Sequence, residues 1–188
     1  MYKLCKTEQS AQRQRILEEG LLQAMATCHY EEISVSDLCD RMNVPRKSFY
    51  RYFSGKDGAL HALIDHTLMR FETGQFWFSA SEAQGFHGEL IRFFCFWKAQ
   101  KPLLDALARS GLSGVLVQRA IDYVLSEAGF RRLHGLAGPG DTEYGIMFVI
   151  CGLMSMTVQW HHSGYEAPVE QMAGVAVRVL TRPLFDGA

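Results

Sequence analysis

The stretch from Ile33 to Lys56 constrains the fold most, because it has the pattern of two short helices joined by one tight turn. Ser34 precedes the first helix and Asp37 follows three residues later, which is the spacing of an N-terminal capping box. Asn43 falls where this helix must end, and asparagine tolerates the left-handed backbone that such a turn needs. Pro45 opens the second helix, since its fixed φ suits a first helical turn. The stretch is therefore predicted to be a helix-turn-helix.

The second helix of this stretch is basic and aromatic on its outer side. Phe49 and Phe53 are four residues apart and are expected to be buried, which leaves the other side chains for the surface. From Arg41 to Lys56 there are five basic residues and no acidic ones, whereas the whole chain of 188 residues has a net charge of −1. A local cluster of cations on a nearly neutral protein favours a specific DNA binder. The alternative from spacing alone is a solvated, charged helix in another helical protein.

The segments Phe49–Asp57 (FYRYFSGKD) and Ser34–Leu38 (SVSDL) resemble the DNA-binding domain of the TetR family of transcriptional regulators. Asn43 stands where the family usually has glycine, and Pro45 replaces a frequent serine. The resemblance implies an all-α fold, in which a three-helix helix-turn-helix bundle precedes a helical ligand-binding and dimerisation domain. It also implies a homodimer on a palindromic, double-stranded DNA operator, with a small-molecule inducer. No motif for a metal or a cofactor is visible in the sequence, so neither is expected.

The expected DNA contacts come from matching this chain to the family pattern. Arginine and lysine at the start of the second helix would meet base edges and phosphates, and hydroxyl groups would hold the sugar-phosphate backbone. Guanine is the commonest base bound by arginine. The residues expected to contact DNA are Ser34, Ser36, Arg46, Lys47, Ser48, Tyr50, Tyr52 and Lys56.

The domain boundary is expected just after the helix-turn-helix. Residues 1–53 would form the DNA-binding domain, with a first helix over residues 7–28, and residues 54–188 the second domain. Ser54, with an acid three residues later, is predicted to cap a linking helix over residues 54–74. No apolar run has the length of a membrane helix and no signal peptide is visible, so a cytoplasmic protein without membrane contact is expected. The scattered cysteines are expected to be small buried hydrophobes.

The stretch 75–100 is rich in phenylalanine and tryptophan, including Phe76, Trp77 and Phe78. Core packing explains such a stretch, but large apolar walls with few polar groups are also what a cavity for an apolar ligand needs. With the resemblance, the stretch predicts a pocket for a small apolar or aromatic ligand. The predicted lining is Phe93, Trp97, Tyr123, Met147, Cys151, Met154 and Trp160.

The last two helices are predicted at residues 142–162 and after Pro168. The first of them is apolar nearly all round and the second is also largely apolar, so a single chain of this size can hardly cover both. In the TetR family the last two long helices form the dimer interface, and these match in position and character. The residues expected at the interface are Gly145, Gly152, Met172, Ala176 and Leu180.

An enzyme is not expected, because no catalytic constellation is visible. His161 and His162 lie about 30 Å along the same helix from Asp141 and Glu143. The function predicted is a ligand-responsive transcriptional regulator, more specifically a repressor. A helical dimerising adaptor that acts through protein contacts is the alternative. The operator, the ligand, the regulated genes and the sign of regulation are left open by the sequence.

Overall fold

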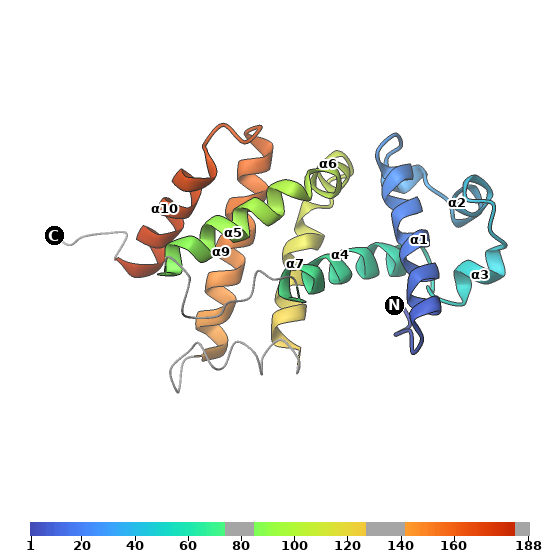
Figure 1. Ribbon diagram of the computed structural model, residues 1–188. Coiled ribbons are helices and arrows are strands. Elements are labelled where there is room, and N and C mark those ends of the chain that lie inside the picture. Colours follow the sequence, from blue (N-terminus) through green and yellow to red (C-terminus); the bar gives the residue numbers. More distant parts are fainter. Residues whose placement is uncertain (74–84, 127–141, 183–188) are drawn as a thin grey trace. The chain divides into compact units, whose positions relative to one another are not determined.

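The computed structural model describes residues 1–73, 85–126 and 142–182, and its regular elements are helices (Figure 1). The predicted all-α fold is confirmed. No helix within these ranges is long and apolar enough to cross a membrane. The elements are α1 (Glu8–Met25), the 3-10 helix η1 (Tyr30–Glu32), α2 (Val35–Arg41), α3 (Arg46–Tyr50), α4 (Lys56–Thr73), α5 (Gly85–Ala99), α6 (Lys101–Arg109), α7 (Ser113–Leu125), α9 (Thr142–His162) and α10 (Val169–Thr181).

The chain divides into two compact units, and each is built from two separate segments. Unit 1 comprises Met1–Thr67 and Pro102–Arg119, and unit 2 comprises Leu68–Lys101 and Ala120–Ala188. The division therefore falls within α4 and within α7. The domain boundary expected after residue 53 stays a prediction.

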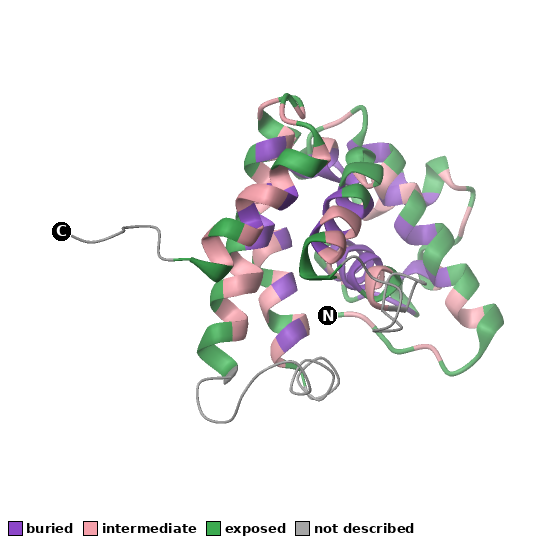
Figure 2. Cartoon of the chain, turned by 60° about the vertical axis from the view of Figure 1, so that its left-hand side comes forward, coloured by how far each residue is buried: buried purple, intermediate pink, exposed green. Residues whose placement is uncertain are grey.

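Unit 1 packs its helices around a core of large apolar side chains. Its fully buried members include Leu21 and Met25 of α1, Phe49 of α3 and Ile64 of α4. In Figure 2 buried positions alternate with exposed ones along the helices, which is typical of amphipathic helices. Gly20 fits this core because a Cβ there would lie only 2.1 Å from the sulfur of Met42.

One ion pair in unit 1 joins segments that are far apart in the sequence. Arg119 of α7 donates from Nε to Asp65 of α4 at 2.9 Å, and the Tyr2 hydroxyl donates to the same carboxylate at 2.7 Å. The Asp65 side chain is buried, so these donors compensate for the water that its charge has lost.

Unit 2 contains the aromatic core. Helix α5 packs along α10, where Ala173 and Ala176 are fully buried, and it also contacts α9. Small side chains on α10 let the two helix backbones approach closely. The ring of Phe94 on α5 meets the ring of Trp160 on α9 edge to face at 5.7 Å. The part of the aromatic stretch that holds Phe76, Trp77 and Phe78 lies outside the described residues.

Two local predictions differ from the structure. Helix α4 begins at Lys56, and the Ser54 hydroxyl donates to the carbonyl of Met1 at 2.9 Å instead of capping the helix. Of the five cysteines only Cys39 is buried, while Cys95 is exposed. Sequence patterns could not indicate either result. The contact of Ser54 with the segment before α1 and the exposure of Cys95 on α5 both depend on tertiary packing.

Candidate DNA-binding site

The turn between α2 and α3 has the features that its residues predict. The Ser34 hydroxyl accepts from the Asp37 backbone N–H at 3.0 Å and donates to the Asp37 carboxylate at 2.6 Å. Asn43 has φ of 52°, in the left-handed region, and the Val44 N–H donates to the Cys39 carbonyl at 3.0 Å. Pro45 directly precedes α3 as its N-cap residue. The short helix α3 is therefore held at a defined angle to α2.

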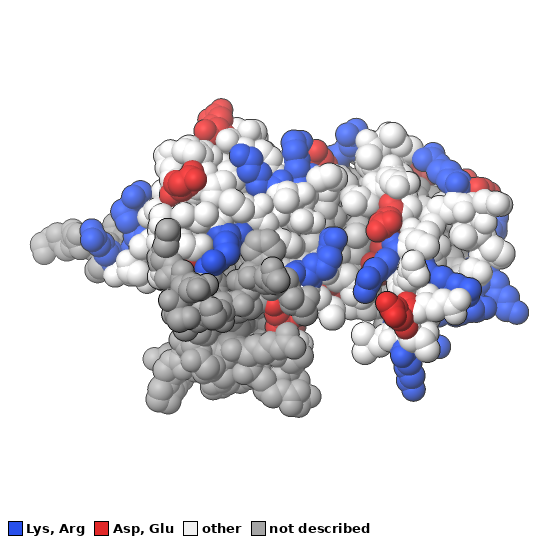
Figure 3. Space-filling view, in the orientation of Figure 1, with Lys and Arg blue, Asp and Glu red and all other residues white. Residues whose placement is uncertain are grey.

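Basic and hydroxyl side chains gather on one surface over α2 and α3. Arg46 donates through Nη2 to the hydroxyl of Ser36, which links the start of α3 to α2. Arg46 and Lys47 are exposed, and Ser48 is partly exposed. Figure 3 shows basic side chains at its right-hand edge, over α3. This surface carries the cations and hydroxyls that phosphate oxygens and base edges require.

The two tyrosines that were expected at DNA lie in different environments. Tyr50 is 56% exposed and its ring leans edge-on against buried Phe49 at 5.7 Å, so it is presented outward. Tyr52 is 5% exposed and packs against Phe53. Tyr52 therefore supports α3 from within unit 1 and is not on the surface that Tyr50 shares with Arg46.

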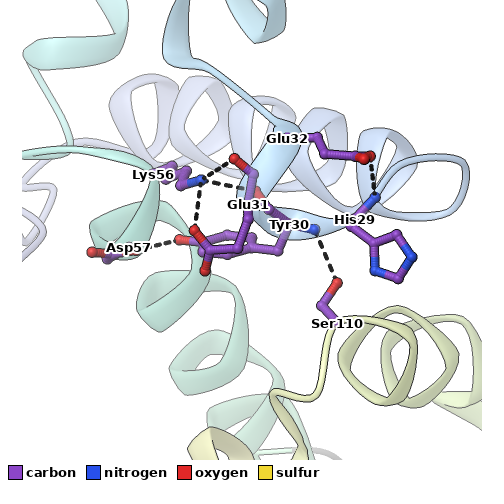
Figure 4. A network of polar contacts seen from close by, with 7 residues as sticks. All are labelled: His29, Tyr30, Glu31, Glu32, Lys56, Asp57 and Ser110. Atoms are coloured by element: carbon purple, nitrogen blue, oxygen red, sulfur yellow. Dashed lines mark hydrogen bonds and ion pairs between the residues drawn. The ribbon is translucent and has the colours of Figure 1, made fainter.

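Lys56 is engaged inside unit 1 (Figure 4). Its ammonium donates to the carbonyls of Tyr30 and Glu31 at 2.8 and 3.2 Å, and lies 3.7 Å from the Glu31 carboxylate. It also lies 4.5 Å above the ring of Tyr30, in cation–π geometry. Lys56 thus holds η1 against the start of α4.

Tyr30, which no sequence motif marks, is the centre of this network (Figure 4). Its backbone N–H donates to the Ser110 hydroxyl at 3.0 Å and its own hydroxyl donates to Asp57 at 2.5 Å. Burial, followed by the hydrogen bond to Asp57, raises the pKa of the Tyr30 hydroxyl well above its ordinary value. Ser110 is 80 residues away along the chain, so no local pattern could have indicated this contact.

The residues predicted to line a ligand pocket lie on α5, α7 and α9 of unit 2. Phe93 and Trp97 are buried neighbours with ring centroids 6.4 Å apart. Tyr123 directs its hydroxyl to the Glu72 carboxylate. Met154 is buried, while Met147 and Cys151 are partly exposed on α9. Trp160 of α9 packs against Tyr165 and donates its N–H to the Ala167 carbonyl at 2.8 Å, so it holds the connection between α9 and α10 in place.

The residues predicted at a dimer interface also differ in exposure. Gly145 and Gly152 are exposed on α9, whereas Met172 and Leu180 of α10 are partly exposed. Ala176 is 1% exposed, so the single chain already covers it. Large apolar side chains next to the two glycines remain exposed, namely Tyr144 at 81% and Phe148 at 68%.

Comparison with known proteins places the DNA-binding segment in a family. Residues 22–63 match the sequence model of the bacterial regulatory proteins, tetR family. This match begins near the end of α1 and includes η1, α2, α3 and the start of α4. Among curated proteins, none is similar enough to the chain to count as a match.

Solved structures share the fold at low sequence identity. The dihydroxyacetone kinase operon activator DhaS is 14% identical with a TM-score of 0.55, over 89% of this chain and 93% of its own. A tetR-family transcriptional regulator from Streptomyces coelicolor is 19% identical with a TM-score of 0.57, over 90% of this chain and 79% of its own. The fatty acid degradation regulator FadR from Bacillus halodurans is 13% identical with a TM-score of 0.57, over 96% and 98%. The helix-turn-helix segment of this chain is therefore similar to that of the tetR family of bacterial regulatory proteins, and the chain shares its all-helical fold with these solved structures.

Proposed function

We propose that the protein is a cytoplasmic homodimer that binds a palindromic operator and leaves it when a small, mainly apolar ligand binds. The observation that carries the proposal is the exposed basic surface of α2 and α3 within the segment that matches the family. The proposed contact residues on that surface are Ser34, Ser36, Arg46, Lys47, Ser48 and Tyr50. Tyr52 and Lys56 would act from behind it, by holding α3 and the start of α4 in place.

The exposed face of α9 supports a homodimer. Tyr144 and Phe148 are one helical turn apart, and Gly152 follows after another turn. A stripe of two exposed aromatic rings and a glycine is costly to leave in water and is suited to a second helix. Dimerisation would set two α3 helices about 34–36 Å apart, or a multiple of that distance, as a symmetric operator requires.

The interior of unit 2 supports an apolar ligand. Phe93, Phe96 and Trp97 of α5 form a continuous set of edge-to-face ring contacts, to which Phe71 of α4 adds. Trp97 is fully buried, and its indole N–H has no acceptor among the described residues. A buried donor without an acceptor costs about 1–3 kcal/mol. A ligand with one hydrogen-bond acceptor on an otherwise apolar body would recover that free energy.

The sign of regulation is proposed to be repression with release by the ligand. The similar structures bear the names of an operon activator and of a fatty acid degradation regulator, so the shared fold does not by itself fix the sign. In the proposed mechanism the ligand binds the DNA-incompetent arrangement more tightly. A coupling free energy of about 1–3 kcal/mol would weaken operator binding about 5- to 150-fold.

Selection of binding duplexes from a random pool, followed by fluorescence anisotropy, tests the DNA function. Arg46→Ala should weaken the selected duplex by about 1–3 kcal/mol if the side chain makes a bidentate base contact. Arg109→Ala, which removes an exposed charge from α6, is the matched control and should leave the affinity unchanged. If no duplex is enriched, or both variants bind like the wild type, the adaptor becomes the better description.

A further inference from the structure

A cleft directly beyond the end of α3 is lined by cations that the proposed DNA contacts do not include. It lies within unit 1, has a volume of about 400 Å³ and extends from the chain segment before α1 to the residues after α3. Its lining residues are Lys3, Leu4, Cys5, Lys6, Thr7, Ser10, Arg51 and Tyr52.

The segment before α1 is fixed at both ends of the cleft. Tyr2 pairs with Phe53 in an antiparallel bridge, and the Lys3 N–H donates to the Tyr52 carbonyl at 2.9 Å. Further along, the Cys5 thiol donates to the side-chain oxygen of Gln14 on α1 at 2.7 Å. The cations on this segment are therefore held next to Arg51.

The electrostatics of the cleft favour an anion. Lys3, Lys6 and Arg51 are exposed and form no ion pair with any residue in the described ranges, and the lining contains no acidic side chain. Thr7 is the N-cap of the 18-residue helix α1, so the positive end of that helix lies at the cleft as well. Figure 3 shows basic side chains below the start of α1, in addition to those over α3.

The chemistry of the lining fits phosphate. Lysine, arginine, hydroxyl groups and helix N-termini are the groups that hold phosphate oxygens in protein–DNA complexes. Duplex DNA carries one charge about every 1.7 Å along its axis. A duplex seated on α3 therefore brings several phosphates close to a cleft that begins at Arg51, one residue after that helix ends.

We propose that this cleft binds a backbone phosphate of the operator, next to the bases that α3 reads. The proposal rests on the proposed DNA function and adds a contact that the helix-turn-helix alone does not make. Lys3 and Lys6 would supply charge without base specificity, and Arg51 would connect the cleft to α3.

The test compares the selected operator duplex bound by the wild type and by the double variant K3A/K6A at several salt concentrations. The slope of log affinity against log salt is negative, and loss of one phosphate contact makes it less steep by about 0.9. At 0.1 M salt this change corresponds to about an eightfold loss of affinity. R109A/R182A removes the same charge from exposed positions in α6 and after α10, and should keep the wild-type slope. K3R/K6R should restore the slope, and thermal melting of each variant checks its folding.

A second measurement identifies the phosphate. Single phosphates that flank the site are replaced by neutral methylphosphonates, one position at a time. The wild type should lose about eightfold at one position, and K3A/K6A should lose nothing further there, because the contact is already absent. If wild type and K3A/K6A have equal salt slopes while Arg46→Ala still binds DNA more weakly, the proposed phosphate contact in the cleft is wrong. The proposed DNA function is then unaffected. Binding of inorganic phosphate that depends on Lys3 and Lys6, without a change in the DNA slope, would show a site for free phosphate and overturn the DNA assignment.

Discussion

Tyr30 shows how much one side chain can join within unit 1. Its hydroxyl is bonded to Asp57, its backbone N–H to Ser110, and its ring lies below the ammonium of Lys56. It thereby connects η1, the start of α4 and the turn after α6. A displacement of that turn would therefore also displace Tyr30, which positions Lys56.

Tyr30→Phe should remove the hydroxyl bond and keep the backbone bond and the ring. We expect a loss of about 0.5–1.5 kcal/mol in the free energy of unfolding at neutral pH, because one intramolecular hydrogen bond is lost and exposed Asp57 can still be hydrated. Urea denaturation measures this difference. Tyr50→Phe, at an exposed tyrosine, is the control.

The same variant should change the pH dependence of stability. Because the folded state raises the pKa of the Tyr30 hydroxyl, its contribution is fully present below the unfolded pKa of about 10 and is lost as the pH rises above it. The wild type should therefore lose more stability than Tyr30→Phe between pH 8 and pH 10.5. Parallel curves for the two proteins over this range would contradict the assignment.

At the scale of elements, the helix-turn-helix was the most predictable part. Ser34, Asn43 and Pro45 act on the backbone within a few residues, so their identities determine where α2 ends and α3 begins. Helix α9 was predictable in its bounds because its apolar run is long and uninterrupted.

The roles of single residues were less predictable where they depend on distant segments. Tyr52 is covered because the segment before α1 binds the chain after α3, and Lys56 is engaged because η1 presents two carbonyls to it. Lys3 and Lys6 could be assigned to a cationic cleft only because the structure places their segment beside Arg51. Sequence periodicity carries no information about such pairings.

Helix α9 provides a test of dimerisation that separates the interface from the core. A Cβ built on Gly152 meets nothing within 4 Å, so Gly152→Arg fits the single chain. In an apolar interface the same arginine would be an unpaired charge and should dissociate the dimer. Analytical ultracentrifugation at micromolar concentration measures this, and circular dichroism should remain that of the wild type.

Ala176→Arg is the informative contrast on α10. Because Ala176 is buried within the chain, an arginine there should unfold unit 2 as well as disrupt association. The proposed dimer interface on α9 is wrong if the wild type sediments as a monomer. It is also wrong if Gly152→Arg sediments as a dimer, like the wild type.

At the scale of the whole molecule, the helix-turn-helix is only part of a unit whose other members come much later in the chain. Unit 1 includes buried Leu104, Leu107 and Leu116 from α6 and α7, besides the ion pair between Asp65 and Arg119. Full burial of a leucine side chain is worth about 1.5–3 kcal/mol. Three such residues together approach the total stability of a typical domain, about 5–15 kcal/mol.

A fragment of residues 1–67 should therefore fail to fold cooperatively, although it contains all of α1, η1, α2 and α3. Thermal melting followed by circular dichroism should give a broad transition for the fragment and a sharp one for the full chain. In the full chain, Arg119→Ala should cost about 3–5 kcal/mol because it leaves Asp65 buried without its cation, while Arg109→Ala should be nearly neutral. A sharp transition and duplex binding by the fragment would refute this dependence.

The separation of Asp65 and Arg119 also has a consequence during synthesis. The two residues are 54 positions apart, and a ribosome adds about 5–20 residues per second, so the cation is made about 3–11 s after the carboxylate. Through that interval the nascent helix-turn-helix lacks the partners that complete its unit. A chain that stops before α7, by premature termination or by proteolysis, is thus predicted to lack a stable unit 1 and would not present the surface of α2 and α3 as the finished protein does.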